Sequence, residues 1–547
     1  MIATSLTALI LFLAASLLCV CFPGAFGWIE RLGAKLATRK RAAILAIAAA
    51  AILVRVSLLW LMPVPLPEVE DEFSYLLAAD TFVHGRLANP PHAMSLYFDT
   101  FHVNQHPTYA SMYPPAQGAA LAVGELLGNP WIGVLLSMGV MCAAALWALQ
   151  GWLPPRWALV GGVLVLFRLA ISSYWINSYW GGAVAAIGGA LVIGALPRIM
   201  RFHRARDAVI LGVGASILAN SRPFEGLIFC LPVFAVLLVW LFRQASPPWR
   251  VSIAEVVAPF CAVMLLCGLF MGYYNWRVTG HPLVFPHLLN EAHYAAVPLF
   301  AWQKTRPLFH FQNPQFEASY NHWWAEQAWS RGRPDSFKNI FATLRSYGRV
   351  LAIFFAWPEL FIPALAAPWV IWDRRTRFLV VQFSICLGGF VLVAWFAPHF
   401  AAALTATIFI LVTQGMRHIR HWRLRGHAFG TFLSRAVVVW AILLSGLHGY
   451  YLRFNPSLDV RAQIAKQLDS SPGNDLVIVQ YLPDHNPGAE WVYNAADIDH
   501  AKVVWARDIP GVSLQPLLDY FHGRRVWILQ ADANPPKLSR FTGEPAP

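Results

Sequence analysis

The sequence predicts a polytopic α-helical membrane protein with about twelve spans and a small α/β domain at its carboxyl end. Three observations support this class. Apolar residues make up 57% of the 547-residue chain and charged residues only 13%, and apolar runs of about 18–22 residues recur along most of it. Lys and Arg gather in the short segments between these runs, as they do in cytoplasmic loops. This distribution accounts for the formal net charge of +13 without a nucleic-acid partner.

The chain opens with an apolar run at 2–22, followed by a basic segment that reaches residue 41. A secretory signal peptide has its positive charge ahead of the apolar run, whereas here the charge comes after it. We therefore expect residues 1–41 to form an extra N-terminal transmembrane helix and a basic cytoplasmic loop. The next run, 42–62, then leads outward, so residues 70–72 are expected on the extracytoplasmic side.

The membrane domain, 42–453, divides into spans that keep the basic segments 198–206, 243–250, 373–377 and 417–425 on the cytoplasmic side. After the first two, spans are expected near 131–150, 157–174, 181–197, 207–222, 226–243, 252–272, 347–371, 378–397, 400–416 and 436–453. Large outer loops remain at 63–130 and 273–346. Residues 116–127 are too few to cross a membrane at about 1.5 Å per residue, so we expect a re-entrant or surface helix there.

Residues 454–547 change character and predict an extracytoplasmic α/β domain. Helices are expected at 460–468 and 514–521, and strands at 476–481, 502–506 and 525–530. All seven cysteines lie within apolar runs. We expect them to be small buried side chains, not a disulfide framework or a metal site.

Three consecutive acids, Glu70, Asp71 and Glu72, follow the second span at the membrane face. Two neighbouring carboxylates can share catalytic work, because one can accept a proton while the other orients a reacting group or pairs with a cation. We expect Asp71 and Glu72 to be catalytic and Glu70 to bind substrate.

Other polar and aromatic residues of the outer segments are candidates for binding a sugar, since aromatic faces stack on pyranose rings and polar groups bind hydroxyls. The alternative is an interfacial aromatic belt with solvated histidines. An arginine at the outer end of a span suits a phosphate, and the alternative there is a structural ion pair between Arg222 and Glu225. The candidate binding residues are Tyr75, His102, His106, Tyr113, Arg222, Glu225, Tyr274, Asn275, His293 and Lys304.

No metal site is expected. His102 and His106 have the spacing of one helical turn, but Pro107 follows directly and no His-Glu-x-x-His pattern is present. A divalent metal is therefore not supported by any ligand pattern.

The acidic pair Asp71-Glu72 followed by Tyr75, in a loop that ends in Tyr113-Pro114-Pro115, resembles the polytopic C-type glycosyltransferases. The similarity is to the branch with dolichyl-phosphate-mannose protein mannosyltransferases and bacterial aminoarabinose lipid A transferases. The resemblance implies inverting sugar transfer on the outer face from a polyprenyl-phosphate-linked donor. It implies that Asp71 is the general base and that Glu72 orients acceptor or donor. The third acid, Glu70, departs from the pattern, and no residue clearly matches the phosphate-binding cations of that family.

Two other functions stay open: a transporter or flippase of lipid-linked sugars, and a non-catalytic envelope-assembly protein. For the enzyme, the expected partners are the polyprenyl-phosphate sugar, the bilayer and an acceptor that is a lipid, a glycan or a protein. We expect a bacterial inner membrane with the active site facing the periplasm; the alternative that fits the basic segments equally is an endoplasmic-reticulum membrane with a lumenal active site. Neither the sugar nor the acceptor is determined by the sequence.

Overall fold

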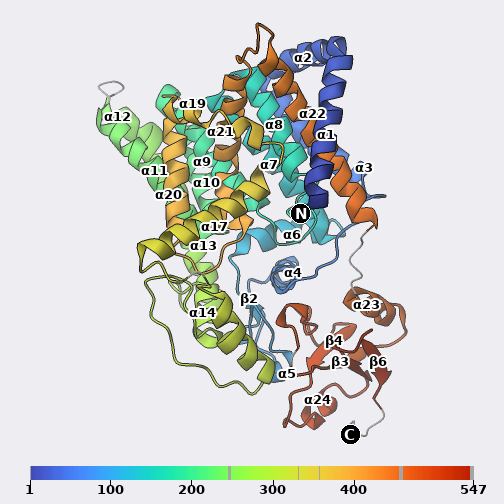
Figure 1. Ribbon diagram of the computed structural model, residues 1–547. Helices are drawn as coiled ribbons and strands as arrows, with labels where there is room; N and C mark the ends of the chain where they lie inside the picture. Colours follow the sequence, from blue (N-terminus) through green and yellow to red (C-terminus); the bar gives the residue numbers. More distant parts are fainter. Residues whose placement is uncertain are drawn as a thin grey trace.

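The computed structural model describes residues 2–243, 248–330, 332–356, 358–454, 460–483 and 485–541. Three layers follow one another along its long axis: a bundle of long helices, a middle layer of short helices and loops, and a small domain with a sheet (Figure 1). The predicted class, a helical membrane protein with a C-terminal α/β region, is confirmed.

The N-terminal segment is helical almost throughout. Helix α1 (Ile2–Cys21) and helix α2 (Pro23–Thr38) meet at an angle of 89°, and α3 (Lys40–Ser57) follows. Most of the basic segment expected as a loop is therefore the helix α2. Pro23 starts it, because proline is tolerated in the first turn of a helix.

The described residues contain six helices that are long and apolar enough to cross a membrane, or seven if the bent pair is one span. The expected number of twelve is not confirmed. The six are α7 (Pro130–Trp152), α9 (Ala183–Phe202), α11 (Pro223–Arg243), the α12–η1–α13 segment (Trp249–Thr279), η3 with α21 (Pro398–Ile419), and α22 (Phe429–Phe454), of which 429–447 meet these criteria. Shorter helices pack among them: α8 (Pro155–Leu169), α10 (Ala205–Ala219) and α20 (Arg377–Phe390).

The span expected at 347–371 is wrong as a single helix. Helix α17 (Phe337–Phe355) ends early, and two short helices follow, α18 (Phe361–Ala364) and α19 (Ala367–Trp372). Pro358, Pro363 and Pro368 explain the break, since each lacks a backbone N–H and crowds the preceding turn.

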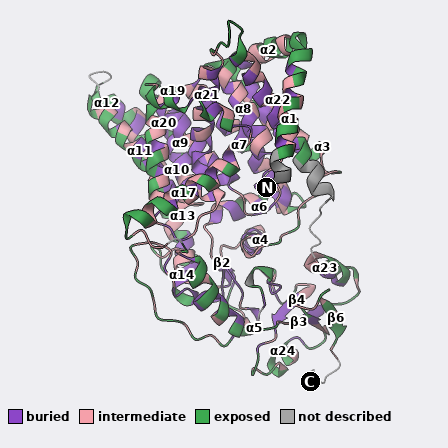
Figure 2. Cartoon of the chain, in the orientation of Figure 1, coloured by how far each residue is buried: buried purple, intermediate pink, exposed green. Residues whose placement is uncertain are grey.

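The centre of the bundle is built on α7, whose small and apolar side chains are buried on most of its surface (Figure 2). Helix α13 (Ala258–Thr279) is the opposite case. It is strongly apolar, yet Leu265, Leu266 and Leu269 are each more than 60% exposed. An apolar helix with an exposed surface is what a lipid-facing position requires.

The middle layer is formed by the two outer loops. The first loop contributes α4 (Glu70–Val83), α5 (Ser95–Phe98), the short strands β1 (Val103–Asn104) and β2 (Ala110–Ser111), and α6 (Pro115–Leu126). The second contributes α14 (Pro286–Tyr294), α15 (Pro314–Phe316), η2 (Glu317–Trp323) and α16 (Trp324–Gln327). Helix α6 is the short helix expected at 116–127.

The C-terminal region contains the five predicted elements and one more strand. In chain order they are α23 (Val460–Ser470), β3 (Asp475–Gln480), β4 (Val503–Arg507), α24 (Gln515–Tyr520), β5 (Arg525–Gln530) and the unpredicted β6 (Lys537–Arg540). The strands lie in the order β4-β3-β5-β6, the first three parallel and β6 antiparallel. The expected domain boundary at 453/454 borders residues 455–459, which lie outside the described residues.

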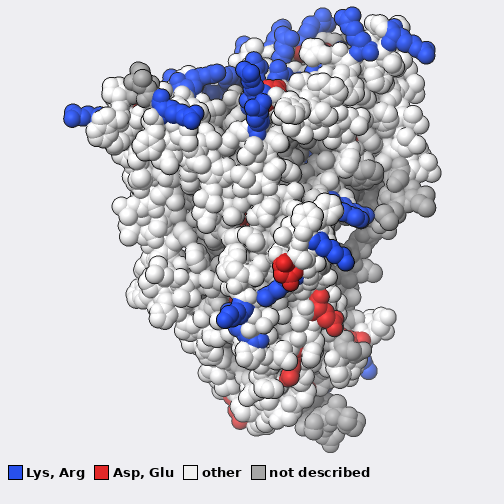
Figure 3. Space-filling view, turned by 60° about the vertical axis from the view of Figure 1, so that its left-hand side comes forward, with Lys and Arg blue, Asp and Glu red and all other residues white. Residues whose placement is uncertain are grey.

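The sheet domain is joined to the middle layer by a shared apolar core. Leu476 and Ile478 of β3 pack in one cluster with Leu77, Tyr97 and Phe98 of the first outer loop. Lys and Arg side chains gather at the far end of the helical bundle, away from this domain (Figure 3).

Candidate active site

The first turn of α4 presents the three acids. Carboxylates are favourable there because the unpaired N–H groups of a helix start carry partial positive charge. Glu72 is buried and uses both oxygens on the backbone: Oε2 accepts from the N–H groups of Glu68 (2.7 Å) and Val69 (3.1 Å), and Oε1 accepts from Tyr179 N–H (2.8 Å). Glu72 thus ties the start of α4 to the turn between α8 and α9.

Asp71 lies in a compact polar group with His102 and Tyr113. Its Oδ1 is 2.8 Å from His102 Nδ1 and also accepts a hydrogen bond from the Tyr113 hydroxyl, which is itself 3.2 Å from His102 Nδ1. The Oδ2 atom has no hydrogen-bond partner among the described residues, and the side chain keeps 19% of its surface exposed. One carboxylate oxygen is therefore held in place while the other is free to accept a proton.

Electrostatic interactions keep Asp71 and His102 charged. Burial alone raises the pKa of Asp71, but the hydrogen bond and charge of His102, with the Tyr113 hydroxyl, hold that pKa below its ordinary value. Burial lowers the pKa of His102, whereas Asp71 and Glu70 raise it, and the net effect is a raised pKa. For Glu70, burial is the largest influence and raises the pKa of its carboxyl.

The backbone at His102 has a positive φ of 61°, which L-residues rarely adopt. Its carbonyl accepts hydrogen bonds from Ser74 Oγ (2.7 Å) and Met112 N–H (3.1 Å). Such a conformation persists only when the surroundings hold it, and it is common at functional sites.

One wall of the site is aromatic and carries a cation. Tyr75 is buried and stacks on Tyr113, with ring centroids 4.3 Å apart. Arg222, in the turn before α11, lies over the Phe400 ring at 4.3 Å and acts electrostatically on Asp71 and Tyr75. No carboxylate oxygen lies within 4.0 Å of its guanidinium among the described residues, so the direct Arg222–Glu225 ion pair is not formed. Burial and the Arg222 charge lower the pKa of the nearby His287 to about 4.

His399, which the sequence did not predict, also belongs to this site, since it acts electrostatically on Asp71. It is buried at the start of η3 (Pro398–Leu404), its Nδ1 lies 2.8 Å from the Tyr174 hydroxyl, and its ring centroid is 4.8 Å from that of Trp180. Gly182 permits this approach, because a Cβ there would lie 2.5 Å from the Trp175 ring and 2.7 Å from Ala402. The expected spans 378–397 and 400–416 already leave residues 398–399 as an outer turn, which is the signal that could have found it.

The remaining predicted residues divide into two groups. Glu225, Tyr274 and Asn275 are buried near the site, where the Tyr274 hydroxyl donates to the Tyr113 carbonyl (3.5 Å) and Asn275 Nδ2 donates to the Pro282 carbonyl (3.2 Å). Tyr274 and Asn275 line a cavity of about 10 Å³.

His106, His293 and Lys304 form the second group and are exposed at the margin. His106 contacts Ser95 Oγ (3.2 Å), and burial and His106 together lower the pKa of His293. His102 and His106 do not share a helix, because β1 lies between them. Among the described residues no group of three or more His, Cys, Asp or Glu could hold a metal ion.

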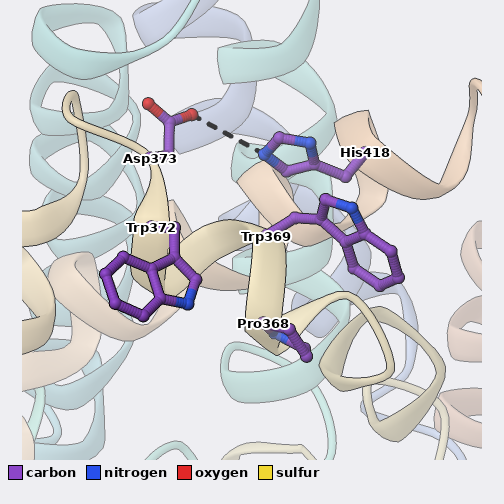
Figure 4. Close-up of a pocket in the computed structure, with 5 residues that line it drawn as sticks. All are labelled: Pro368, Trp369, Trp372, Asp373 and His418. Carbon is purple, nitrogen blue, oxygen red and sulfur yellow. Dashed lines mark ion pairs between the residues drawn. The ribbon is translucent and has the colours of Figure 1, made fainter.

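A larger hollow of about 300 Å³ lies at the other end of the bundle, beside α19 (Figure 4). Pro368, Trp369 and Trp372 line it with Asp373, whose Oδ2 is 3.6 Å from His418 Nε2. This hollow contains none of the predicted site residues.

No family model and no curated protein sequence matches the chain. Solved structures do match. ArnT from Cupriavidus metallidurans bound to undecaprenyl phosphate is 12% identical and aligns with a TM-score of 0.50 over 88% of this chain and 92% of that chain. The chain has the C-type glycosyltransferase fold. The predicted resemblance is thereby confirmed at the level of the fold.

Two further structures with this fold are similar. ArnT from Cupriavidus metallidurans in the apo state is 13% identical, with a TM-score of 0.49 over 92% of this chain and 93% of that chain. The Archaeoglobus fulgidus oligosaccharyltransferase tethered with an acceptor peptide is 12% identical, with a TM-score of 0.47 over 80% of this chain. The match covers 62% of that enzyme's length, so the present chain spans less than two thirds of it.

Proposed function

We propose that this chain is a membrane glycosyltransferase that moves a sugar from a polyprenyl-phosphate-linked donor to an acceptor hydroxyl, with inversion. The observation that carries the proposal is the Asp71 carboxylate, with Oδ1 fixed by His102 and Tyr113 and Oδ2 free and partly exposed. The likeness to the ArnT structure with bound undecaprenyl phosphate supports a donor of this chemical class.

The reaction follows from these groups. Asp71 Oδ2 accepts the acceptor's hydroxyl proton as the oxygen forms a bond to the anomeric carbon. The bond from the anomeric carbon to the phosphate oxygen breaks on the opposite face, and the polyprenyl phosphate leaves with the bonding electrons. Arg222 has no carboxylate oxygen within 4.0 Å among the described residues. Its charge is therefore available to stabilise the departing phosphate.

We assign Glu72 a positioning role in this reaction, because both of its oxygens already accept backbone hydrogen bonds. The chemistry requires no metal, since a phosphate is already a modest leaving group.

The arrangement of charge supports an active site on the outer side of the membrane. Lys and Arg gather at the end of the bundle opposite the sheet domain (Figure 3), and cytoplasmic segments carry this excess. A bacterial inner membrane, with the basic end of the bundle in the cytoplasm and the site facing the periplasm, fits this distribution of charge.

The arginines inside apolar helices argue against a transporter. Arg55 is fully buried and donates to the carbonyls of Met62 (2.8 Å) and Pro63 (3.3 Å). Arg168 donates to the Phe354 carbonyl (2.8 Å) and lies 3.3 Å from Glu359. Both charges serve the structure, whereas coupling charges of transporters line a pathway.

The test is consumption of radiolabelled polyprenyl-phosphate sugars by the purified protein in lipid nanodiscs. Wild type should consume one donor of the panel, Asp71→Asn should lose this activity, and Asp497→Asn, at a half-exposed acid of the sheet domain, should keep it. Full activity of a folded Asp71→Asn protein would refute the assignment. No consumption of any donor by folded wild type would favour transport or a scaffold.

A further inference from the structure

A buried ion pair in the sheet domain lies where this domain meets both outer loops. Arg507, the last residue of β4, has no exposed surface and pairs with the buried Glu490. Glu490 also accepts hydrogen bonds from the Tyr481 hydroxyl and from the N–H groups of Trp491 (2.9 Å) and Val492 (2.8 Å). The carboxylate is thus fixed within its own domain, and it fixes the arginine.

The guanidinium of Arg507 reaches beyond its own domain. Its Nη2 donates to the Asp99 carbonyl of the first outer loop (3.4 Å). Its centre lies 4.8 Å from the Tyr481 ring and 5.2 Å from the Phe316 ring of the second outer loop. One side chain therefore joins the sheet domain to both loops, through contacts that are strong when water is excluded.

These contacts lie next to the segment that carries His102. Asp99 is three residues before His102, and Phe101 between them packs on Phe316 with ring centroids 4.9 Å apart. On the other side, the Trp324 ring lies 5.6 Å from the His102 ring. A positive φ at His102 needs such support from its surroundings.

The topology of the sheet explains why Arg507 points toward the loops. In parallel α/β sheets the strands' carboxyl ends form the functional edge, at the point where strand order reverses. Here β3 lies between β4 and β5, so this edge carries Arg507. The same edge is filled by the chain itself, since Leu482 N–H (2.8 Å) and His485 Nδ1 (2.6 Å) both contact the Asp532 carboxylate. It is therefore suited to holding protein and not a ligand.

We propose that Arg507 is a positioning residue that holds residues 99–102 and Phe316 so that His102 stays beside Asp71. This inference rests on the proposed role of Asp71 and deepens it, because it makes the sheet domain a part of the active site's support. The remaining Arg507 nitrogens, Nε and Nη1, are buried without a hydrogen-bond partner among the described residues. Burying these two unpaired donors costs free energy, which indicates that the position of the side chain has a structural purpose.

The experiment compares Arg507→Met and Arg507→Lys with a matched control, Arg525→Met. Arg525 also forms an ion pair in the same sheet, with Asp475 at 2.8 Å, and among the described residues its other side-chain hydrogen bond goes to Ser471 of the same domain. Hydrogen exchange is measured by mass spectrometry on full-length protein in nanodiscs. Arg507→Met should speed exchange of peptides covering 100–104 and 316–324 about tenfold, Arg507→Lys should do so less, and Arg525→Met should leave them unchanged.

A second measurement separates positioning from general stability. If Arg507→Met lets His102 move away from Asp71, the acid limb of the pH–activity profile should shift to higher pH by about one unit. Arg525→Met should keep the acid limb of the wild type. Phe316→Leu weakens the contacts of Phe316 with Arg507 and Phe101 and leaves the sheet domain intact. It should therefore reproduce the faster exchange and the shifted acid limb even if Arg507→Met does not fold.

The outcomes are distinct from those that test the reaction. Wild-type exchange at 100–104 in Phe316→Leu and in folded Arg507→Met would overturn the positioning role, whatever the chemistry. A fully active Asp71→Asn would remove the proposed reaction, and the exchange data would still decide whether Arg507 holds this segment. A matching loss of folded protein in Arg507→Met and Arg525→Met, with normal exchange in Phe316→Leu, would also overturn it.

Discussion

The change His102→Gln should move the acid limb of the pH–activity profile upward. In the wild type, His102 holds the pKa of Asp71 below its ordinary value, against the effect of burial. Activity needs ionised Asp71, so it is present above that pKa and is lost as the pH falls through it. Without the imidazolium, burial is opposed only by weaker influences, and the pKa of Asp71 should rise.

The contact itself sets the size of the shift. The His102 Nδ1 to Asp71 Oδ1 distance is 2.8 Å, and the two side chains are 8% and 19% exposed. A hydrogen bond to a charged group in such surroundings contributes about 1.5–3 kcal/mol. At about 1.36 kcal/mol per pKa unit, the acid limb should rise by about one to two pH units.

The assay is the initial rate of donor consumption between pH 4 and pH 8 (about the range where His and carboxyl groups titrate), in nanodiscs. His106→Gln is the matched control, because His106 lies in the same loop, is exposed and contacts Ser95 instead of an acid. An acid limb in His102→Gln that coincides with that of the wild type would refute the coupling between His102 and Asp71.

Three further outcomes are expected. Glu72→Ala leaves three backbone N–H groups without their acceptor and should lower stability by about 2–4 kcal/mol, seen as a lower midpoint of thermal unfolding. A midpoint equal to that of the control Glu317→Ala, at a half-exposed acid, would contradict this. Arg222→Met should raise the donor KM about 10–100-fold, whereas the exposed Arg277→Met should not. Burial raises the pKa of Asp99 to about 6, so this group favours folding most below its unfolded pKa and loses that contribution as the pH rises toward 6. Asp99→Asn should therefore remove the fall in thermal stability between about pH 4 and 6, and an unchanged fall would show that another group causes it.

Much of the fold could be read from local pattern. The apolar runs located α7, α9, α11, α13 and α21, and the alternation of apolar residues located β3, β4 and β5. The prediction of a single span at 347–371 was wrong because it relied on the overall apolarity of the segment and neglected three prolines. Each proline breaks helical hydrogen bonding. The expected twelve crossings are not confirmed by the six or seven sufficiently long apolar helices of the described residues, since apolarity alone does not separate a span from a buried short helix.

The candidate site was predicted in part. Asp71, His102, Tyr113 and Arg222 were named from residue type and from their place at the outer ends of apolar runs, and the structure brings them together. His106, His293 and Lys304 have the same chemical character and lie at the margin. Nothing local distinguishes these two groups, because their difference is one of packing.

By itself, the sequence determined which segments leave water, that three acids follow an apolar run at the membrane face, and that residues 454–547 form an α/β region. These properties depend on neighbouring residues, through hydrophobicity and the hydrogen-bonding needs of the backbone. Tertiary structure alone decided that Glu72 serves the backbone, that His399 completes the site and that Arg507 meets Asp99 and Phe316. A contact such as that between Arg507 and Asp99, 408 positions apart, depends on how whole elements pack, and no local pattern encodes that packing.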